Sequence, residues 1–158
     1  NTYQGILVVF DGIDGAGKTT QARRLSDDLA AVGEVVVLSK EPTDGTYGAR
    51  LRASAQSGRL PFDEELDLFV ADRQEHLREK ISPALQAGHV VILDRYFYST
   101  LAYQGARAGT LRDIEERIRK DVIHPDITFW IETPPELLSF ASNNGTVPRT
   151  ISKKLTTS

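Results

Sequence analysis

The stretch Gly12-Ile13-Asp14-Gly15-Ala16-Gly17-Lys18-Thr19 decides the fold, because it fits the pattern G-x-x-x-x-G-K-[ST] that encloses phosphate groups. It lies between a short apolar run, residues 6–10, and a segment of helical periodicity, residues 21–32. The glycines allow consecutive backbone N–H groups to face one anion at the positive end of a helix. The sequence therefore predicts a buried strand, a phosphate-binding loop and a helix, in that order.

Each part of this loop has an expected role in binding ATP. The ammonium of Lys18 should reach the β- and γ-phosphates, and the hydroxyl of Thr19 should bind Mg²⁺. Asp94 ends another apolar run and is expected to hold Mg²⁺ directly or through water. The predicted ATP-binding set is Gly12, Asp14, Gly15, Ala16, Gly17, Lys18, Thr19 and Thr20. The alternatives are a glycine-rich turn without a ligand and, at position 94, a carboxylate that only caps the next segment.

Further apolar runs place this loop in an α/β fold. Residues 35–38, 90–93 and 127–131 have the pattern of buried strands, and they alternate with segments of helical character. Those segments cover residues 48–57, 63–88 and 111–122, with Asp63 as an expected N-cap and Pro83 as a kink or restart. Such alternation predicts a single-domain parallel sheet with helices on both faces, and ligands at the carboxyl ends of its strands.

Composition excludes several other classes of protein. The chain has 158 residues, 40% hydrophobic and 26% charged, with a formal net charge of −3, which argues against a general nucleic-acid binder. It has no cysteine, so disulfides and thiolate metal sites are excluded. The three histidines, His76, His89 and His124, lack metal-ligand spacing. No apolar run approaches membrane-spanning length, so we expect a cytoplasmic protein without membrane partners.

Two longer stretches resemble the thymidylate kinase family. Residues 94–105, Asp-Arg-Tyr-Phe-Tyr-Ser-Thr-Leu-Ala-Tyr-Gln-Gly, are similar to that family's D-R-[YH]-x-x-S-x-x-A-[YF]-Q-G signature, and residues 10–21 are similar to its F-[ED]-G-x-D-G-x-G-K-[ST]-T-Q opening. The resemblance covers about residues 5–137. It implies a P-loop fold of the nucleoside monophosphate kinase type, a homodimer formed through helices, and Mg²⁺-dependent transfer of the γ-phosphoryl group of ATP to dTMP, giving dTDP.

The same resemblance implies the residues that bind the base and the sugar. Phe69 would stack on thymine, and Arg73, one helical turn later, would hydrogen-bond the base. Asp14 would accept the 3′-hydroxyl of the deoxyribose, and Tyr103 would crowd the 2′ position and exclude ribonucleotides. Ser99 and Gln104 would line the base and sugar side of the pocket. Taken alone, these residues fit ordinary packing, turn or solvated roles equally well.

Other matched residues are implied to hold the acceptor phosphate. Arg95 and one of Arg50 or Arg52 would bind it, with the choice between these two left open, and Glu41, which begins the matched stretch 41–43, is also expected to bind the substrate. The acceptor is ionised at neutral pH, so the reaction needs alignment and positive charge but no general base. The predicted strand ends carry cationic side chains and no histidine, which suits that demand.

The last part of the chain departs from the family pattern. Family members carry the catalytic arginine either in the phosphate loop or in a lid, and Gly15 implies the lid arrangement here. We therefore divide the chain into a kinase domain, residues 1–138, and an atypical lid or tail, residues 139–158, where Arg149 is the available arginine. Lys18, Arg95 and Arg149 form the predicted catalytic set.

Two other functions remain open at this point. A protein of this fold could bind nucleotides without turning them over, which the atypical lid segment would favour. A deoxynucleoside kinase would instead phosphorylate a 5′-hydroxyl with the help of a carboxylate base, a role that Glu41 could fill.

Overall fold

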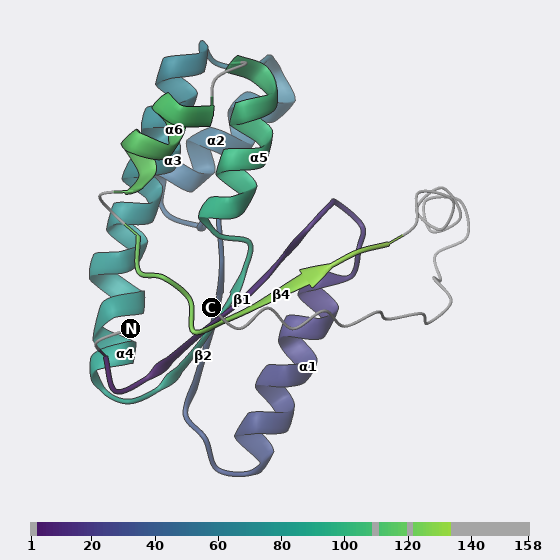
Figure 1. Ribbon diagram of the computed structural model, residues 1–158, viewed down its shortest axis with the longest axis vertical. Helices are drawn as coiled ribbons and strands as arrows, with labels where there is room; N and C mark the ends of the chain where they lie inside the picture. The colour runs from purple at the N-terminus through teal and green to yellow at the C-terminus, as the bar shows by residue number, and fades with distance from the viewer. Residues whose placement is uncertain (1–2, 109–110, 120–121, 134–158) are drawn as a thin grey trace.

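Four parallel strands form the sheet of the described residues, which are 3–108, 111–119 and 122–133 of this computed structural model. They are β1 (Ile6–Gly12), β2 (Val36–Lys40), β3 (Val90–Asp94) and β4 (Ile127–Ile131). Their order is β2-β3-β1-β4, and Figure 1 shows β4 beside β1. Every pairing is parallel, which confirms the predicted α/β fold with its parallel sheet.

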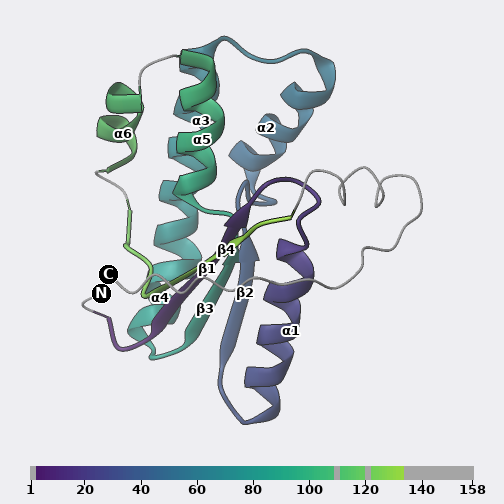
Figure 2. The same cartoon turned by 45° about the vertical axis from the view of Figure 1, so that its right-hand side comes forward.

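Helices connect the strands and cover both faces of the sheet. They are α1 (Lys18–Ala31), α2 (Thr46–Ser57), α3 (Phe62–His76), α4 (Ser82–Gln86), α5 (Phe97–Ala108) and α6 (Leu111–Arg119). Figure 2 shows α1 on one side of the strands and α3, α4 and α5 on the other. α2 packs against α3, and α6 packs against α5. No helix within the described ranges is long and apolar enough to cross a membrane.

Alternating side chains of the strands build two separate hydrophobic cores. In β1, Leu7 and Val9 face the core under α3, α4 and α5, whereas Val8 and Phe10 face the core under α1. Phe10 stacks on Phe129 of β4 with ring centroids 4.8 Å apart. Because successive side chains of a strand point to opposite faces, a strand buried on both sides must be apolar at every position. This requirement explains the continuous apolar runs in the sequence.

The long helical region after β2 differs in two details from the prediction. Asp63 is not the N-cap of α3, because the helix begins at Phe62 after Pro61, and Asp63 lies in its first turn. A carboxylate there still stabilises the positive end of the helix dipole. The restart at Pro83 is confirmed: a π-helical turn, η1 (Leu77–Ile81), precedes α4, which carries Pro83 in its first turn, where no backbone N–H is needed.

β2 and β3 end level with Phe10 of β1 at one edge of the sheet. Phe10 and Lys40 both lie opposite Asp94 in the β1–β3 and β2–β3 registers. β1 continues through Asp11 and Gly12 beside β4. Asp11, Glu41 and Arg95, which follow the three level residues, therefore lie at the same edge, and the site is built from them.

Candidate nucleotide-binding site

The phosphate loop leaves β1 and enters α1 with a backbone that requires glycine. Gly12 has φ 137°, and a Cβ there would lie 2.3 Å from the carbonyl oxygen of Ile131. Gly17, the N-cap of α1, has φ 94°, a left-handed conformation that favours glycine. No side chain from this residue can cover the positive end of α1, so the first amides of the helix remain available to an anion.

Lys18 projects back across the loop at the start of α1. Its Nζ donates to the carbonyl oxygen of Ile13 at 2.6 Å, and the residue is 6% exposed. Burial lowers the pKa of Lys18, as does the neighbouring Arg95, while Asp94, Asp14 and Asp11 act in the opposite direction. The loop therefore holds a desolvated cation beside the positive end of the helix, where a polyphosphate would lie.

Thr19 and Asp94, the two predicted Mg²⁺ ligands, are brought together by the fold. The hydroxyl of Thr19 donates a short hydrogen bond to Oδ2 of Asp94, across 75 residues of sequence. A hydroxyl and a carboxylate are the hard oxygen ligands that Mg²⁺ prefers, with phosphates and water completing its shell. Within the described part of the chain, no group of three or more His, Cys, Asp or Glu side chains could hold a metal ion. The donor set thus fits Mg²⁺ bound together with a nucleotide.

A cleft of about 440 Å³ lies beside the loop. The residues that line it include Lys18, Thr19 and Asp94 together with Glu41, Arg52 and Arg95. Arg52 is held there by the carbonyl oxygens of Thr43, at 2.5 Å, and Pro42, at 3.2 Å. Arg50, the alternative considered from the sequence, lies outside this cleft and pairs with Glu64 at 3.3 Å. The geometry thus favours Arg52 over Arg50 as the residue that binds the acceptor phosphate.

Arg95 joins the phosphate loop to α5. Its guanidinium donates to the carbonyl oxygen of Gly12 at 3.2 Å and to the hydroxyl of Ser99 at 2.8 Å, and it forms an ion pair with Asp14. The hydroxyl of Tyr103 donates to the other oxygen of Asp14 at 3.1 Å. Four of the predicted substrate-binding residues (Asp14, Arg95, Ser99 and Tyr103) therefore form one cluster.

Within this cluster, Ser99 does something the sequence did not predict. Its hydroxyl donates to Oδ1 of Asp11 at 2.7 Å while accepting from Arg95, so it bridges a buried carboxylate and the arginine. Oδ1 of Asp11 also accepts from the backbone N–H of Gly12 at 2.8 Å. This arrangement fixes Arg95 against the loop. The Ser99 hydroxyl, which was expected to line the base and sugar side, is therefore already engaged in hydrogen bonds within the protein.

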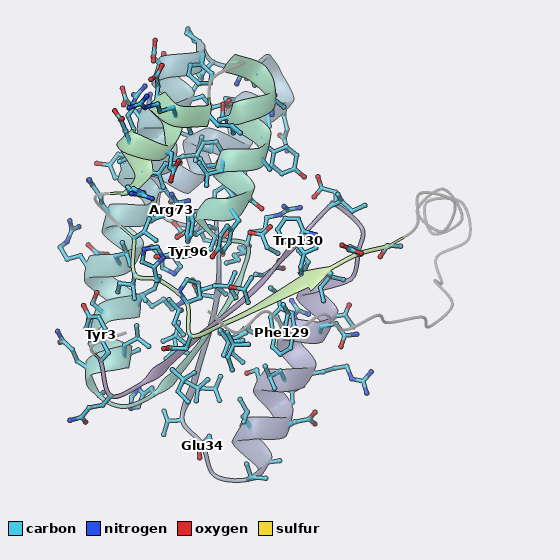
Figure 3. The ribbon with its side chains drawn as sticks, in the orientation of Figure 1. Tyr3, Glu34, Arg73, Tyr96, Phe129 and Trp130 are labelled. Atoms are coloured by element: carbon cyan, nitrogen blue, oxygen red, sulfur yellow. The ribbon has the colours of Figure 1, made fainter. Side chains whose placement is uncertain are left out.

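Arg73 is the largest fully buried side chain in the described residues, with 2% exposure. Its Nε and Nη2 donate to Oε2 of Glu41 at 2.9 and 2.8 Å, and Nη2 also donates to the hydroxyl of Thr100 at 2.9 Å. The guanidinium lies 5.3 Å from the centre of the Tyr96 ring, and Figure 3 shows the two side chains next to each other. Phe69, half-buried, precedes Arg73 by one turn of α3.

Gln104 lies one turn after Thr100 on α5 and is 1% exposed. Its amide nitrogen donates to Oε2 of Glu65 at 2.9 Å. Because Glu65, Phe69 and Arg73 follow at intervals of four on α3, they share a helix face with which Gln104 and Thr100 make contact. Nη1 of Arg73 and Oε1 of Gln104 are buried and have no hydrogen-bond partner among the described residues. Such unpaired groups in a buried site call for a ligand.

Four residues of this site were missed from the sequence: Asp11, Glu65, His76 and Thr100. Glu65 precedes Phe69 by the same four-residue step that separates Phe69 from Arg73, and this spacing was a usable signal. Thr100 and Gln104 carry the same signal on α5, but it becomes visible only when the segment is known to be a helix. No histidine lies at the strand ends in the sequence, but α3 brings His76 to Glu41 and to Ser39 of β2.

Three further residues of the predicted ATP-binding set lie in or directly after the loop. Gly15 and Thr20 line the cleft, and the carbonyl oxygen of Ala16 accepts from the hydroxyl of Thr133 at 3.4 Å. Arg149, the lid segment 139–158 and the boundary at residue 138 lie outside the described residues.

These features define a P-loop nucleotide-binding protein whose cleft is also lined by two arginines, Arg52 and Arg95. The family model of thymidylate kinase matches residues 10–145, and the chain belongs to the thymidylate kinase family. A thymidylate kinase of Xanthomonas oryzae pv. oryzae is 51% identical over 131 residues, which are 83% of this chain and 57% of that protein. One of Xylella fastidiosa is 47% identical over 133 residues, which are 84% of this chain and 61% of that protein.

A solved structure agrees with these relatives. The crystal structure of thymidylate kinase from Ehrlichia chaffeensis superimposes with a TM-score of 0.75 at 32% identity, covering 89% of this chain and 79% of that one. The chain spans 57–61% of the length of the two curated relatives described above.

Proposed function

We propose that this chain transfers the γ-phosphoryl group of ATP to dTMP, with Mg²⁺, giving ADP and dTDP. The observation that carries the proposal is that one cleft is lined by both sets of residues. We assign Lys18, Thr19 and Asp94 to the donor, and Arg52 and Arg95 to the acceptor phosphate. Two phosphate-binding half-sites in one cleft suit direct transfer between two phosphates, which depends on alignment and on positive charge.

The two unpaired groups near α3 and α5 support a pyrimidine as the base. Nη1 of Arg73 is a hydrogen-bond donor and Oε1 of Gln104 is an acceptor, and both are buried. Thymine offers the complementary pair, a carbonyl oxygen at O4 and the N–H at N3. Phe69, on the same face of α3, supplies an aromatic ring for stacking. Asp14 and Tyr103 are hydrogen-bonded to each other. Asp14 would then bind the 3′-hydroxyl, and Tyr103 would exclude a 2′-hydroxyl.

Mg²⁺ would be held by Thr19 and Asp94 and would neutralise charge that develops on the β- and γ-phosphate oxygens. Lys18 places a second positive charge at the same end of the cleft. Arg95, fixed by Ser99 and Gly12, holds the acceptor phosphate in line with the donor. None of these residues has to remove a proton, because a nucleoside monophosphate is largely ionised at neutral pH.

The contacts of Glu41 argue against a deoxynucleoside kinase. That reaction needs a carboxylate free to accept the proton of a 5′-hydroxyl. Both oxygens of Glu41 are engaged, Oε2 by Arg73 and Oε1 by His76, and the residue is 7% exposed. Glu41 therefore serves the site by holding Arg73, although it also lines the cleft.

The remaining parts of the proposal rest on the family. Because Gly15 leaves the loop without an arginine, we assign the lid role to Arg149. We also propose a homodimer formed through helices, in the cytoplasm.

The test is product formation. Purified chain of known intact mass is mixed with ATP, Mg²⁺ and dTMP, and dTDP is separated by ion-exchange chromatography. Appearance of dTDP, abolished by EDTA, supports the proposal. Tight binding of ATP and dTMP without dTDP would favour a nucleotide-binding protein without turnover, and failure to bind dTMP would refute the assignment of the acceptor.

A further inference from the structure

His76, the last residue of α3, has no role in the phosphoryl transfer described above. It is 5% exposed and touches Glu41 and Ser39, which lie 35 and 37 residues away in the sequence at the end of β2. Its Nδ1 lies 3.2 Å from Oε1 of Glu41, and its Nε2 lies 2.9 Å from the hydroxyl oxygen of Ser39 on β2. A buried imidazole with both nitrogens engaged has a defined orientation and a defined hydrogen-bonding pattern.

That pattern follows from the chemistry of the partners. A carboxylate only accepts hydrogen bonds, so Nδ1 of His76 must carry the proton that it donates to Glu41. In the neutral ring Nε2 is then the acceptor, and the Ser39 hydroxyl donates to it. If the ring is protonated, Nε2 donates and the Ser39 oxygen accepts. In either case the bond from His76 to Glu41 persists.

Glu41 is consequently held from two sides. Oε1 accepts from His76, and Oε2 accepts from both Nε and Nη2 of Arg73. The carboxylate can neither rotate nor turn towards the cleft without losing one of these bonds. Since Thr100 holds Nη2 as well, the remaining donor, Nη1, is left in one fixed direction and unpaired.

Ser39, His76 and Glu41 have the order of a nucleophilic triad, but the contacts indicate another role. In a triad the carboxylate orients the histidine, whereas here Arg73 also donates two hydrogen bonds to Glu41. Ser39 and His76 also line a cavity of about 710 Å³ on the β2 side. The imidazole thus separates this cavity from Glu41. An apolar side chain would remove the hydrogen bond to Glu41 and weaken the hold of this carboxylate on Arg73.

We infer that His76 is a positioning residue for base recognition: it fixes Glu41, which fixes Arg73, whose free Nη1 meets the base. This inference deepens the proposed function and rests on it. It makes a specific claim, because a histidine that acted only in packing would affect all ligands alike. A positioning histidine affects the affinity for the base that Arg73 contacts and leaves the affinity for ATP unchanged.

The test combines calorimetry with three variants. His76→Leu removes both hydrogen bonds, His76→Asn can keep a donor near the position of Nδ1, and His89→Leu is the control. His89 lies next to β3 at the edge of the sheet opposite the cleft. We expect His76→Leu to weaken the binding of dTMP about tenfold, or about 1.4 kcal/mol. The same change should reduce the preference for dTMP over dCMP, because cytosine has an amino group where thymine has O4. His76→Asn should stay within about threefold of wild type. ATP–Mg²⁺ affinity should change in none of them.

A second measurement does not depend on ligand binding. Long-range ¹H–¹⁵N NMR of the wild-type chain, with the His76 signal assigned by loss in His76→Asn, should show a proton on Nδ1. A ring protonated only at Nε2 would overturn the inference, as would unchanged dTMP affinity and base preference in His76→Leu. Equal losses of dTMP and ATP affinity would also overturn it, because they would indicate a packing role. If wild type binds ATP but not dTMP, the proposed function itself fails, and this inference fails with it.

Discussion

Replacing Lys18 by methionine separates catalysis from stability in this protein. Methionine keeps most of the apolar stem and removes the ammonium group, which is buried and bonded to the carbonyl oxygen of Ile13 at 2.6 Å. We expect phosphoryl transfer to collapse and the fold to survive, because Lys18 contributes its charge to the cleft and supports neither hydrophobic core.

The structure sets the size of both effects. Loss of one preorganised cationic donor to the transferring group costs about 10²–10³ in turnover, or roughly 2.7–4 kcal/mol. For stability, losing a charged hydrogen bond costs about 1.5–3 kcal/mol, but the variant also avoids the desolvation of an ammonium, a penalty of several kcal/mol. These contributions oppose each other. The free energy of unfolding should therefore fall by no more than about 1 kcal/mol, and it could rise.

Single-turnover formation of dTDP at saturating ATP–Mg²⁺ measures the chemical step, and urea unfolding followed by circular dichroism measures stability. Lys80→Met is the matched control, since Lys80 is exposed on η1 and lies outside the phosphate cleft. An unaltered rate in Lys18→Met would refute the role of the ammonium. A fall in rate matched by an equal loss of folded protein would refute it as well.

The remaining predictions concern single positions around the cleft. Tyr103→Ala should reduce the preference for dTMP over UMP by about tenfold in competition assays, because a steric barrier is removed; an unchanged ratio would exclude that role. Arg52→Gln should raise the KM for dTMP about tenfold and Arg50→Gln should not, and the reverse pattern would exchange their roles. Gly12→Ala should destabilise the fold by about 3 kcal/mol or more, since its Cβ would meet the carbonyl oxygen of Ile131 at 2.3 Å, and a normal unfolding curve would contradict this. Arg149→Ala should lower turnover about 10³–10⁵-fold with dTMP affinity unchanged; brisk turnover in this variant would place the catalytic charge elsewhere.

The assignment of the lid role to Arg149 also limits the turnover rate that we expect of this chain. If Arg149 closes over the phosphates less well than a helical arginine of the family would, the chain binds dTMP well and turns over slowly. Binding is expected to survive because Asp14, Phe69, Arg73, Arg95 and Tyr103 all precede the atypical segment.

Much of the fold could be predicted because local patterns determine it. β1 and β3 are buried on both faces and appear as unbroken apolar runs, whereas β2 and β4 are partly exposed but still largely apolar. The phosphate loop has a fixed spacing of glycines and lysine. α5 was not predicted as a helix. Its residues, which begin Phe97-Tyr98-Ser99-Thr100, combine aromatic, hydroxyl and β-branched side chains of modest helix propensity. Packing of Phe97 and Leu101 against the core supplies the stabilisation that local propensity lacks.

The site was predictable where it follows a motif and not where it depends on packing. Thr19 was assigned from the phosphate-loop motif, and Asp94 from its position at the end of an apolar strand. The pairing of Glu41 with Arg73 spans 32 residues and that of Ser39 with His76 spans 37, so no local sequence pattern predicts these two contacts. The bridge from Asp11 through Ser99 to Arg95 likewise depends on the parallel pairing of β1 and β3.

The most direct test of the account compares acceptors in one assay of ADP release, with ATP–Mg²⁺ and protein of known intact mass. The acceptors are dTMP, dUMP, UMP and thymidine. The account predicts release with dTMP, less with dUMP, little with UMP and none with thymidine, because Arg52 and Arg95 require an acceptor phosphate and Tyr103 excludes the ribose. Phosphorylation of thymidine, or equal use of UMP and dTMP, would contradict it.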